Sequence, residues 1–214
     1  MSKTRVHNFV VSLDGYASGV DQSLERAFGD AQDTFIQWFR RQHVFRGAQP
    51  GATLGPDEAI AAAWGPGIGA DIMGRNIFRP TSGPWPDDGW RGWWGEDPPF
   101  HTPCFIWTHY PRPPIVMEGG TVFHFVSGSP SEVLALAKEA AGDQDVRIGG
   151  GPTTVNRFLA ADLVDHLHII LIPVVLGDGV PLWAGLGGLQ ERFAVDTLSV
   201  PSGATHLFFT RHEQ

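Results

Sequence analysis

Two short stretches of this 214-residue sequence place glycine and polar side chains directly after an apolar run. One is DIMGRN, residues 71–76, and the other is VRIGGGPTT, residues 146–154. In both, a strand-like run enters glycine and a helix-like pattern follows. The first turn of a helix has unpaired N–H groups and a partial positive charge, which favour a phosphate, and glycine lets the ligand approach the backbone. Arginine and threonine add a charge and hydroxyl donors, so the candidate anion-binding residues are Gly74, Arg75, Gly149, Gly150, Gly151, Thr153 and Thr154.

Neither stretch matches a common nucleotide-binding motif. The G-x-G-x-x-G fingerprint requires glycine where Thr154 stands, and the chain has no P-loop lysine. A glycine cluster can also serve only to turn a strand into a helix, and for either stretch alone the two interpretations weigh equally. The hypothesis of a nucleotide site therefore depends on the pair. Two such junctions facing one crevice could hold the two ends of a dinucleotide at the carboxyl ends of the strands.

Composition excludes several other classes of protein. The formal net charge of −8 argues against a general nucleic-acid surface, so an anionic ligand must be held locally. No apolar run approaches the roughly 20 residues of a membrane span, which predicts no membrane partner. The single cysteine, Cys104, has no partner for an internal disulfide, which favours a cytoplasmic protein, and its place on a strand predicts a buried small hydrophobe. His166 and His168 share one face of a strand without an evident third ligand, so no metal site is predicted.

The elements that must position these residues alternate along the chain. Strands are expected at residues 6–13, 71–73, 104–109, 121–128, 145–151 and 166–177, and a final pair at 192–200 and 205–213 is joined by a turn. Helices are expected at about 30–45, 55–64, 129–142 and 153–164, the third with a capping box formed by Ser129 and Glu132. Proline and glycine exclude a long regular element from residues 83–103.

This alternation predicts an α/β fold. Helices on both faces would make a three-layer sandwich around a central mixed, mostly parallel sheet, with a C-terminal antiparallel hairpin. Residues 1–214 are expected to form one domain, with an irregular Trp-rich insertion at about 83–103, because no interior linker is visible.

Several motifs resemble those of a known family when they are taken in order. FVVSLDG, IMGRNIF, FIWTH and the long block VRIGGGPTTVNRFLAADLVDHLHIILIPVVLGDGVPLW resemble the dihydrofolate-reductase-like family. The nearest branch is the reductase domain of bifunctional riboflavin-biosynthesis enzymes, and the resemblance covers nearly the whole chain. It implies an NADPH-dependent reductase of a small heterocyclic or carbonyl/imine substrate, similar to 5-amino-6-(5-phosphoribosylamino)uracil reductase. It also implies a homodimer. A non-catalytic nucleotide-binding relative and a dimeric interaction protein are the alternatives.

The resemblance also implies roles for individual residues. Gly74, Arg75 and Asn76 would meet cofactor phosphates, and the triple glycine with Thr153 and Thr154 would cradle the pyrophosphate. Thr108 and His109 would lie near the adenosine ribose and its 2′-phosphate. Family members often have arginine after the hydroxyl residue, whereas this chain has His109. The cofactor could therefore be NADH as well as NADPH. Ser12 belongs to the loop that would lie beside the nicotinamide.

Two further candidates concern the substrate. Asp14 could position the substrate or relay the proton that a reduction needs, although Asp-Gly is equally ordinary turn chemistry. Trp93 and Trp94 lie in a segment that holds Trp85 and Trp90 as well. Their rings could bind a substrate, form an interface with a partner subunit, or fold onto their own loop.

Overall fold

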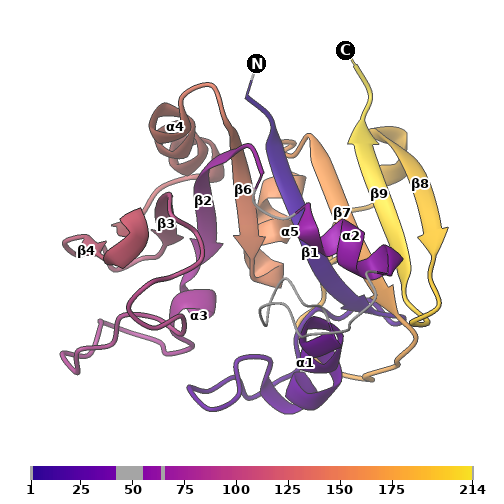
Figure 1. Ribbon diagram of the computed structural model, residues 1–214, viewed down its shortest axis with the longest axis horizontal. Helices are drawn as coiled ribbons and strands as arrows, with labels where there is room; N and C mark the ends of the chain where they lie inside the picture. Colours follow the sequence, from indigo (N-terminus) through magenta and orange to yellow (C-terminus); the bar gives the residue numbers. More distant parts are fainter. Residues whose placement is uncertain (1, 42–54, 64–65, 214) are drawn as a thin grey trace.

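Nine strands form one continuous sheet in the computed structural model, which describes residues 2–41, 55–63 and 66–213 (Figure 1). Their order is β4-β5-β3-β2-β6-β1-β7-β9-β8. The pairs from β5 to β7 are parallel, whereas β4 and the two C-terminal strands pair antiparallel. The predicted mixed sheet with a C-terminal hairpin is therefore confirmed. The strands are β1 Thr4–Ser12, β2 Ile68–Gly74, β3 Pro103–Trp107, β4 Ile115–Val116, β5 Val122–Val126, β6 Asp145–Gly150, β7 His166–Ile172, β8 Phe193–Ser199 and β9 Thr205–Arg211.

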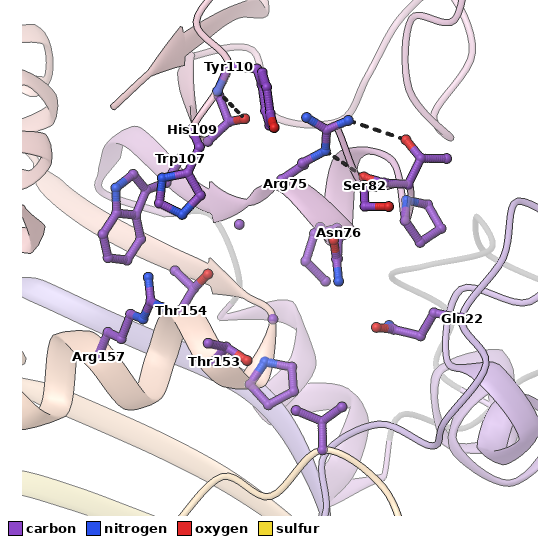
Figure 2. Close-up of a pocket in the computed structure, with 18 of the residues that line it drawn as sticks. Gln22, Arg75, Asn76, Ser82, Trp107, His109, Tyr110, Thr153, Thr154 and Arg157 are labelled. Atoms are coloured by element: carbon purple, nitrogen blue, oxygen red, sulfur yellow. Dashed lines mark hydrogen bonds between the residues drawn. The ribbon is translucent and has the colours of Figure 1, made fainter. Parts of the chain in front are cut away.

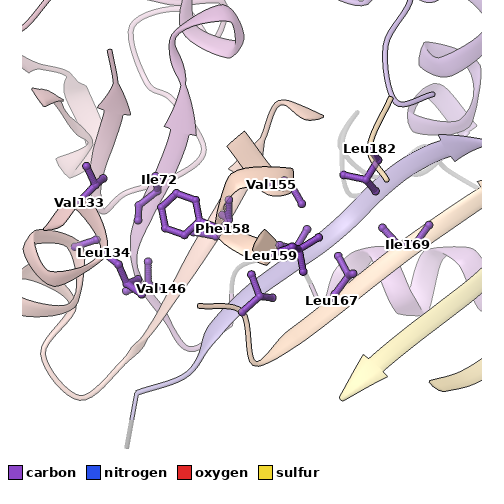
Figure 3. Close-up of a cluster of buried hydrophobic side chains, with 14 of the residues drawn as sticks. Ile72, Val133, Leu134, Val146, Val155, Phe158, Leu159, Leu167, Ile169 and Leu182 are labelled. Carbon is purple, nitrogen blue, oxygen red and sulfur yellow. The ribbon is translucent and has the colours of Figure 1, made fainter. Parts of the chain in front are cut away.

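Helices cover both faces of this sheet, as the three-layer prediction requires (Figure 1). On one face α4 and α5 bury a large apolar cluster that includes Phe158 and Ile72, and Figure 3 shows these side chains together. On the other face α1 and α2 pack through Phe35 and Ala61 against Val10 of β1. The helices are α1 Gln32–Arg41, α2 Pro56–Ala62, α3 Arg75–Phe78, α4 Pro130–Ala141 and α5 Pro152–Ala160, with short 3-10 turns at Gly29–Ala31, Glu118–Gly120 and Leu189–Glu191.

The start of α4 is the predicted capping box. The Ser129 hydroxyl accepts the N–H of Glu132 at 3.3 Å, and the Glu132 carboxylate accepts the N–H of Ser129 at 2.7 Å. Two of the first orphan donors of the helix are thereby satisfied. Gly142, with φ of 62°, follows the last helical residue. The local sequence thus defines both ends of this helix.

Several elements differ from the sequence expectation, and the two-residue strand β4 was not expected. Strand β7 ends at Ile172 rather than 177, because Pro173 has no N–H to continue the ladder. Helix α5 ends at Ala160 rather than 164, and Asp162 beyond it adopts φ of 60°, which is incompatible with a right-handed helix. The expected helix at 30–45 is α1, whose predicted continuation from 42 to 45 lies outside the described residues, as does the predicted end of α2 at Trp64.

A chain of buried imidazoles joins α2 to the sheet. The Asn8 N–H donates to His168 Nδ1 at 3.1 Å, so the proton of neutral His168 must lie on Nε2. That group can then donate to His206 Nδ1 at 2.9 Å, which leaves His206 Nε2–H to donate to Asp57 Oδ1 at 3.1 Å. Burial is the main cause that lowers the pKa of His168 to about 2 from its ordinary 6.5, with smaller effects from His7 and His206. Each neutral ring therefore has one defined tautomer.

None of the helices that the structure describes combines the length and the apolar composition needed to cross a membrane. Cys104 of β3 is fully buried, as predicted, and burial raises the pKa of its thiol well above the usual value.

Candidate functional site

A cavity of about 630 Å³ opens at the carboxyl ends of β2, β3 and β6 (Figure 2). The two glycine junctions enter it from β2 and β6, and the segment after β3 forms a third wall. Parallel strands place their carboxyl ends at one edge of the sheet, where α/β folds bind ligands. Most of the residues predicted to bind a cofactor meet here: Gly74, Arg75, Asn76, Thr108, His109, Gly151, Thr153 and Thr154 line the cavity.

Three other predicted residues lie elsewhere. Ser12 is fully buried at the end of β1, Gly149 is exposed within β6, and Gly150 is buried against Phe9 and Ile77. None of the three is among the residues described as lining the cavity. Only the last of the three successive glycines therefore borders the space that a ligand would occupy.

Gly74 has a packing role that the sequence did not reveal. A Cβ added at this position would collide with Thr154 Oγ1, which belongs to the other junction. Because β2 and β6 are paired, their ends approach each other closely at this point. The glycine at residue 74 is thus needed for the two junctions to meet, whether or not a phosphate lies against it.

Arg75 contacts residues of the segment that follows it in the chain. Its Nε donates to the Thr81 carbonyl at 2.6 Å, and its guanidinium carbon lies 3.9 Å from the Trp85 ring centroid. Burial lowers the pKa of Arg75 from its usual value. This arginine therefore contributes a charge near the cavity, with Nε and Nη2 bonded to Thr81 and Nη1 buried without a hydrogen-bond partner among the described residues.

The first turn of α5 offers backbone donors to the cavity. Its N-cap residue, Gly151, has no side chain to cap the helix, and Pro152 in the first position has no N–H. The early N–H groups of a helix have no acceptor within it, so those of Thr153 and Thr154 can receive an anion. The two threonines also place their side chains toward the cavity in Figure 2.

Sequence reasoning missed Arg157, Trp107 and Gln22, which also line the cavity. Arg157 follows the two threonines by one helical turn, and this i, i+3/i+4 spacing was the available signal. No Asp or Glu is found among the described residues that line the cavity. The site is therefore electropositive within an acidic chain.

Asp14 lies outside this cavity and is held by three donors. It accepts the Ser12 hydroxyl at 2.6 Å and the N–H groups of Leu176 and Gly177 at 3.1 and 2.7 Å. The Ser12 hydroxyl, followed by the two backbone donors, lowers the pKa of Asp14 to about 2, against the opposing effect of desolvation. The carboxylate is therefore ionised at neutral pH, and it ties the end of β1 to the segment after β7.

Trp93 and Trp94 do not line the cavity. Trp93 Nε1–H donates to the Ile77 carbonyl at 2.8 Å, and Trp94 stacks on Phe123 of β5 with ring centroids 5.7 Å apart. Trp94 belongs to a cluster that covers the β3 and β5 side of the sheet, together with Phe100. These contacts support the interpretation that the rings fold onto their own loop, and substrate binding by them stays a prediction.

We expect Trp94→Ala to lower the free energy of unfolding by about 2 kcal/mol, because it removes a half-buried aromatic ring from this cluster. Urea unfolding at neutral pH measures the change. Trp93→Ala is the matched comparison and should cost less, since Trp93 is outside the cluster. Equal losses from the two variants would contradict this assignment.

Comparison with known proteins identifies the family to which this chain belongs. Residues 4–208 match the family described as the RibD C-terminal domain. The uncharacterized protein YwjB of Bacillus subtilis (strain 168) is 37% identical over 59 residues, which are 28% of this chain. That match spans 33% of the curated relative, about a third of its length.

Solved structures share the fold at low sequence identity. A protein from Shewanella sp. PV-4 with a riboflavin-biosynthesis name is 21% identical, with a TM-score of 0.59 and all of both chains covered. Dihydrofolate reductase from Enterococcus faecalis, complexed with NADP(H) and RAB-propyl, is 13% identical with a TM-score of 0.53, covering 99% of this chain and 97% of that one. RibD of Acinetobacter baumannii is 14% identical with a TM-score of 0.52, and this chain spans 59% of it. These similarities confirm the predicted dihydrofolate-reductase-like fold.

Proposed function

This chain belongs to the RibD C-terminal domain family, and on that premise we propose that it is an NADPH-dependent reductase of a small molecule. The family and the fold support a reductase-type activity. The proposed substrate class is a heterocycle, imine or carbonyl compound, of which 5-amino-6-(5-phosphoribosylamino)uracil is the example suggested by the family. The observation that carries the proposal is the cavity in which two glycine junctions meet and whose described lining residues include no carboxylate.

The residues present fit a dinucleotide. The first turn of α5 would hold the pyrophosphate through the N–H groups of Thr153 and Thr154, and Gly151 would leave room for it. Asn76 would add an amide donor from α3. Trp107 and Tyr110 offer ring faces in the same cavity. The volume of about 630 Å³ lies within the usual range of about 300–1,000 Å³ for ligand sites.

The reaction needs a hydride and a proton. Bound NADPH would supply the hydride, and the protein would orient the acceptor and exclude water. Asp14 is ionised at neutral pH, so we propose that it positions the substrate and the loops at the end of β1 rather than donating the proton.

We expect Asp14→Asn to lower kcat about tenfold while leaving the shape of the pH–rate profile between pH 5 and 9 unchanged. The amide cannot accept all three hydrogen bonds that the carboxylate accepts, so the loop geometry suffers. Steady-state turnover of wild type and variant across this range measures both quantities. A displaced acidic limb in the variant would instead make Asp14 a proton-transfer group.

A nucleotide titration tests the proposed function. Trp107 lines the cavity, so NADPH should quench its emission and accept its excitation energy, and the thermal midpoint should rise with ligand concentration. An acceptor screen that follows NADPH absorbance would then define the substrate. If millimolar NADPH and NADH both leave emission and thermal midpoint unchanged, the proposal is wrong.

Two alternatives give different results in the same experiments. A non-catalytic relative would bind nucleotide and reduce no acceptor. A dimeric interaction protein would do neither, although a reductase of this kind can also dimerise. Strand β8 ends the sheet and exposes Val195 and Leu198, which supports the proposal of a homodimer formed through this edge. Molar mass from light scattering, measured beside the titration, separates these cases.

A further inference from the structure

Arg157 lines the cavity, and the proposed function does not yet give it a ligand group to bind. It projects from α5 and lines the cavity beside Thr154 (Figure 2). Its side chain makes no hydrogen bond or ion pair with the residues that the structure describes. Its guanidinium carbon lies 5.5 Å from the centroid of the Trp107 ring. Such a ring supports a guanidinium and leaves its N–H groups available to a ligand.

The charge balance of the cavity favours an anion at this position. The chain carries a formal net charge of −8, yet the described lining residues include two arginines and neither Asp nor Glu. Arg75 donates from Nε and Nη2 to the carbonyl and the hydroxyl of Thr81, and its buried Nη1 has no hydrogen-bond partner among the described residues. Both arginines bring a positive charge to the cavity, and Arg157 is the one whose guanidinium donates no hydrogen bond to the described residues.

The kind of anion follows from the donors available. The pyrophosphate of a dinucleotide can be held by the N–H groups of Thr153 and Thr154 in the first turn of α5, which carries only a partial charge. A phosphate monoester carries about 1.5 to 2 negative charges at neutral pH, so it gains more from a full cation. A guanidinium fork matches its oxygens in pairs. NADPH carries one such monoester at its 2′ position, and NADH carries none.

Arg157 also lies at the appropriate end of the cavity. Trp107, which it contacts, is the last residue of β3, and Thr108 and His109 follow directly. The family resemblance implies that these two residues lie near the 2′-phosphate, and His109 stands where arginine is common. Figure 2 places Arg157, Trp107 and His109 toward one side of the cavity and Gln22 toward the other. Helix α5 thus supplies a cation that the segment after β3 lacks.

We infer that Arg157 binds the 2′-phosphate of the cofactor and makes this protein select NADPH over NADH. The inference rests on the proposed function and assigns to it a residue outside the predicted set. The expected binding energy comes from one bidentate, charge-assisted pair between the guanidinium and the phosphate in a partly exposed site.

The test compares nucleotides with and without this phosphate by calorimetry on the full chain. Wild type should bind NADPH at least tenfold more tightly than NADH, and adenosine 2′,5′-bisphosphate more tightly than 5′-AMP. Arg157→Gln should weaken NADPH and the bisphosphate at least tenfold and change NADH and 5′-AMP less than twofold. Arg91→Gln is the matched control, because it removes the same charge from an exposed ion pair with Glu96.

The outcomes separate the two proposals. Wild type that binds none of these nucleotides overturns the proposed function. The assignment of Arg157 is wrong if the wild type binds NADPH and NADH with equal affinity. It is also wrong if Arg157→Gln loses affinity for both nucleotides to the same extent. Neither result contradicts the proposed reductase function. The thermal midpoint of Arg157→Gln without ligand, compared with that of the wild type, shows whether the variant is folded.

Discussion

Valine at Gly151 is expected to lower the affinity for NADPH about thirtyfold with little loss of fold stability. Gly151 lines the cavity and has φ of −80°, which any residue can adopt. A Cβ there would meet only the Ile77 side chain, at an ordinary distance of 3.5 Å. The remaining methyl groups of valine would occupy the space of the ligand, at a cost of about 2 kcal/mol in binding. Calorimetric titration and thermal melting of the free protein measure the two effects.

The neighbouring glycines provide internal controls for this prediction. Gly149→Val should leave both properties near wild type, because the residue is exposed and a Cβ would find only the Ile72 carbonyl, at 3.7 Å. Gly150→Val should lose stability as well as affinity, since its φ of 119° disfavours every side chain. The three variants therefore have three different expected outcomes. If Gly151→Val binds NADPH as wild type does, the ligand does not pass beside this residue.

Acid is expected to destabilise this protein steeply below pH 6.5 because of His168. Its pKa is about 2 in the folded state and about 6.5 in the unfolded chain. Between these values the unfolded chain binds a proton at this site and the folded chain does not, so each lower pH unit favours unfolding by about 1.4 kcal/mol. Because the slope is only half of this at pH 6.5 itself, the loss from pH 6.5 to 4.5 amounts to about 2 kcal/mol. Burial lowers the pKa of His7 also, which acts in the same direction.

Urea unfolding at half-unit pH steps measures this slope. His168→Gln keeps one acceptor and one donor in place of the imidazole, and it removes the titrating group. The variant should be less stable at pH 8, yet its slope between pH 6 and 4.5 should be smaller than that of wild type by about 1.4 kcal/mol per pH unit. His166→Gln, on the same strand but outside the imidazole chain, is the control. Parallel curves for wild type and His168→Gln would contradict the role of the buried ring.

The fold was largely predictable because its signals are local. The capping box at Ser129, the apolar runs and the turn before β9 each depend on neighbours within a few residues. Errors arose where a local signal was overridden or misjudged, as at Pro173, which ended β7 five residues early. The order of the family motifs then supported the whole arrangement.

The candidate site was predictable only in part. The two glycine junctions were identified, and the pairing of β2 with β6 brings their ends together. The three successive glycines could not be distinguished by sequence, because their φ angles and exposure depend on the strands around them. Arg157 was missed for a similar reason, since the face of α5 that meets the cavity is set by its packing on the sheet.

The alternation of strands and helices, the strand–glycine–helix junctions and the family pattern can be read from the sequence, because they depend on side chains near one another in the chain. Which groups share a site depends on the folded structure. Asp14 meets Gly177 across 163 positions, and His206 meets Asp57 across 149. Such contacts follow from strand order and register, which are set by how all the apolar faces are buried together rather than by any one segment.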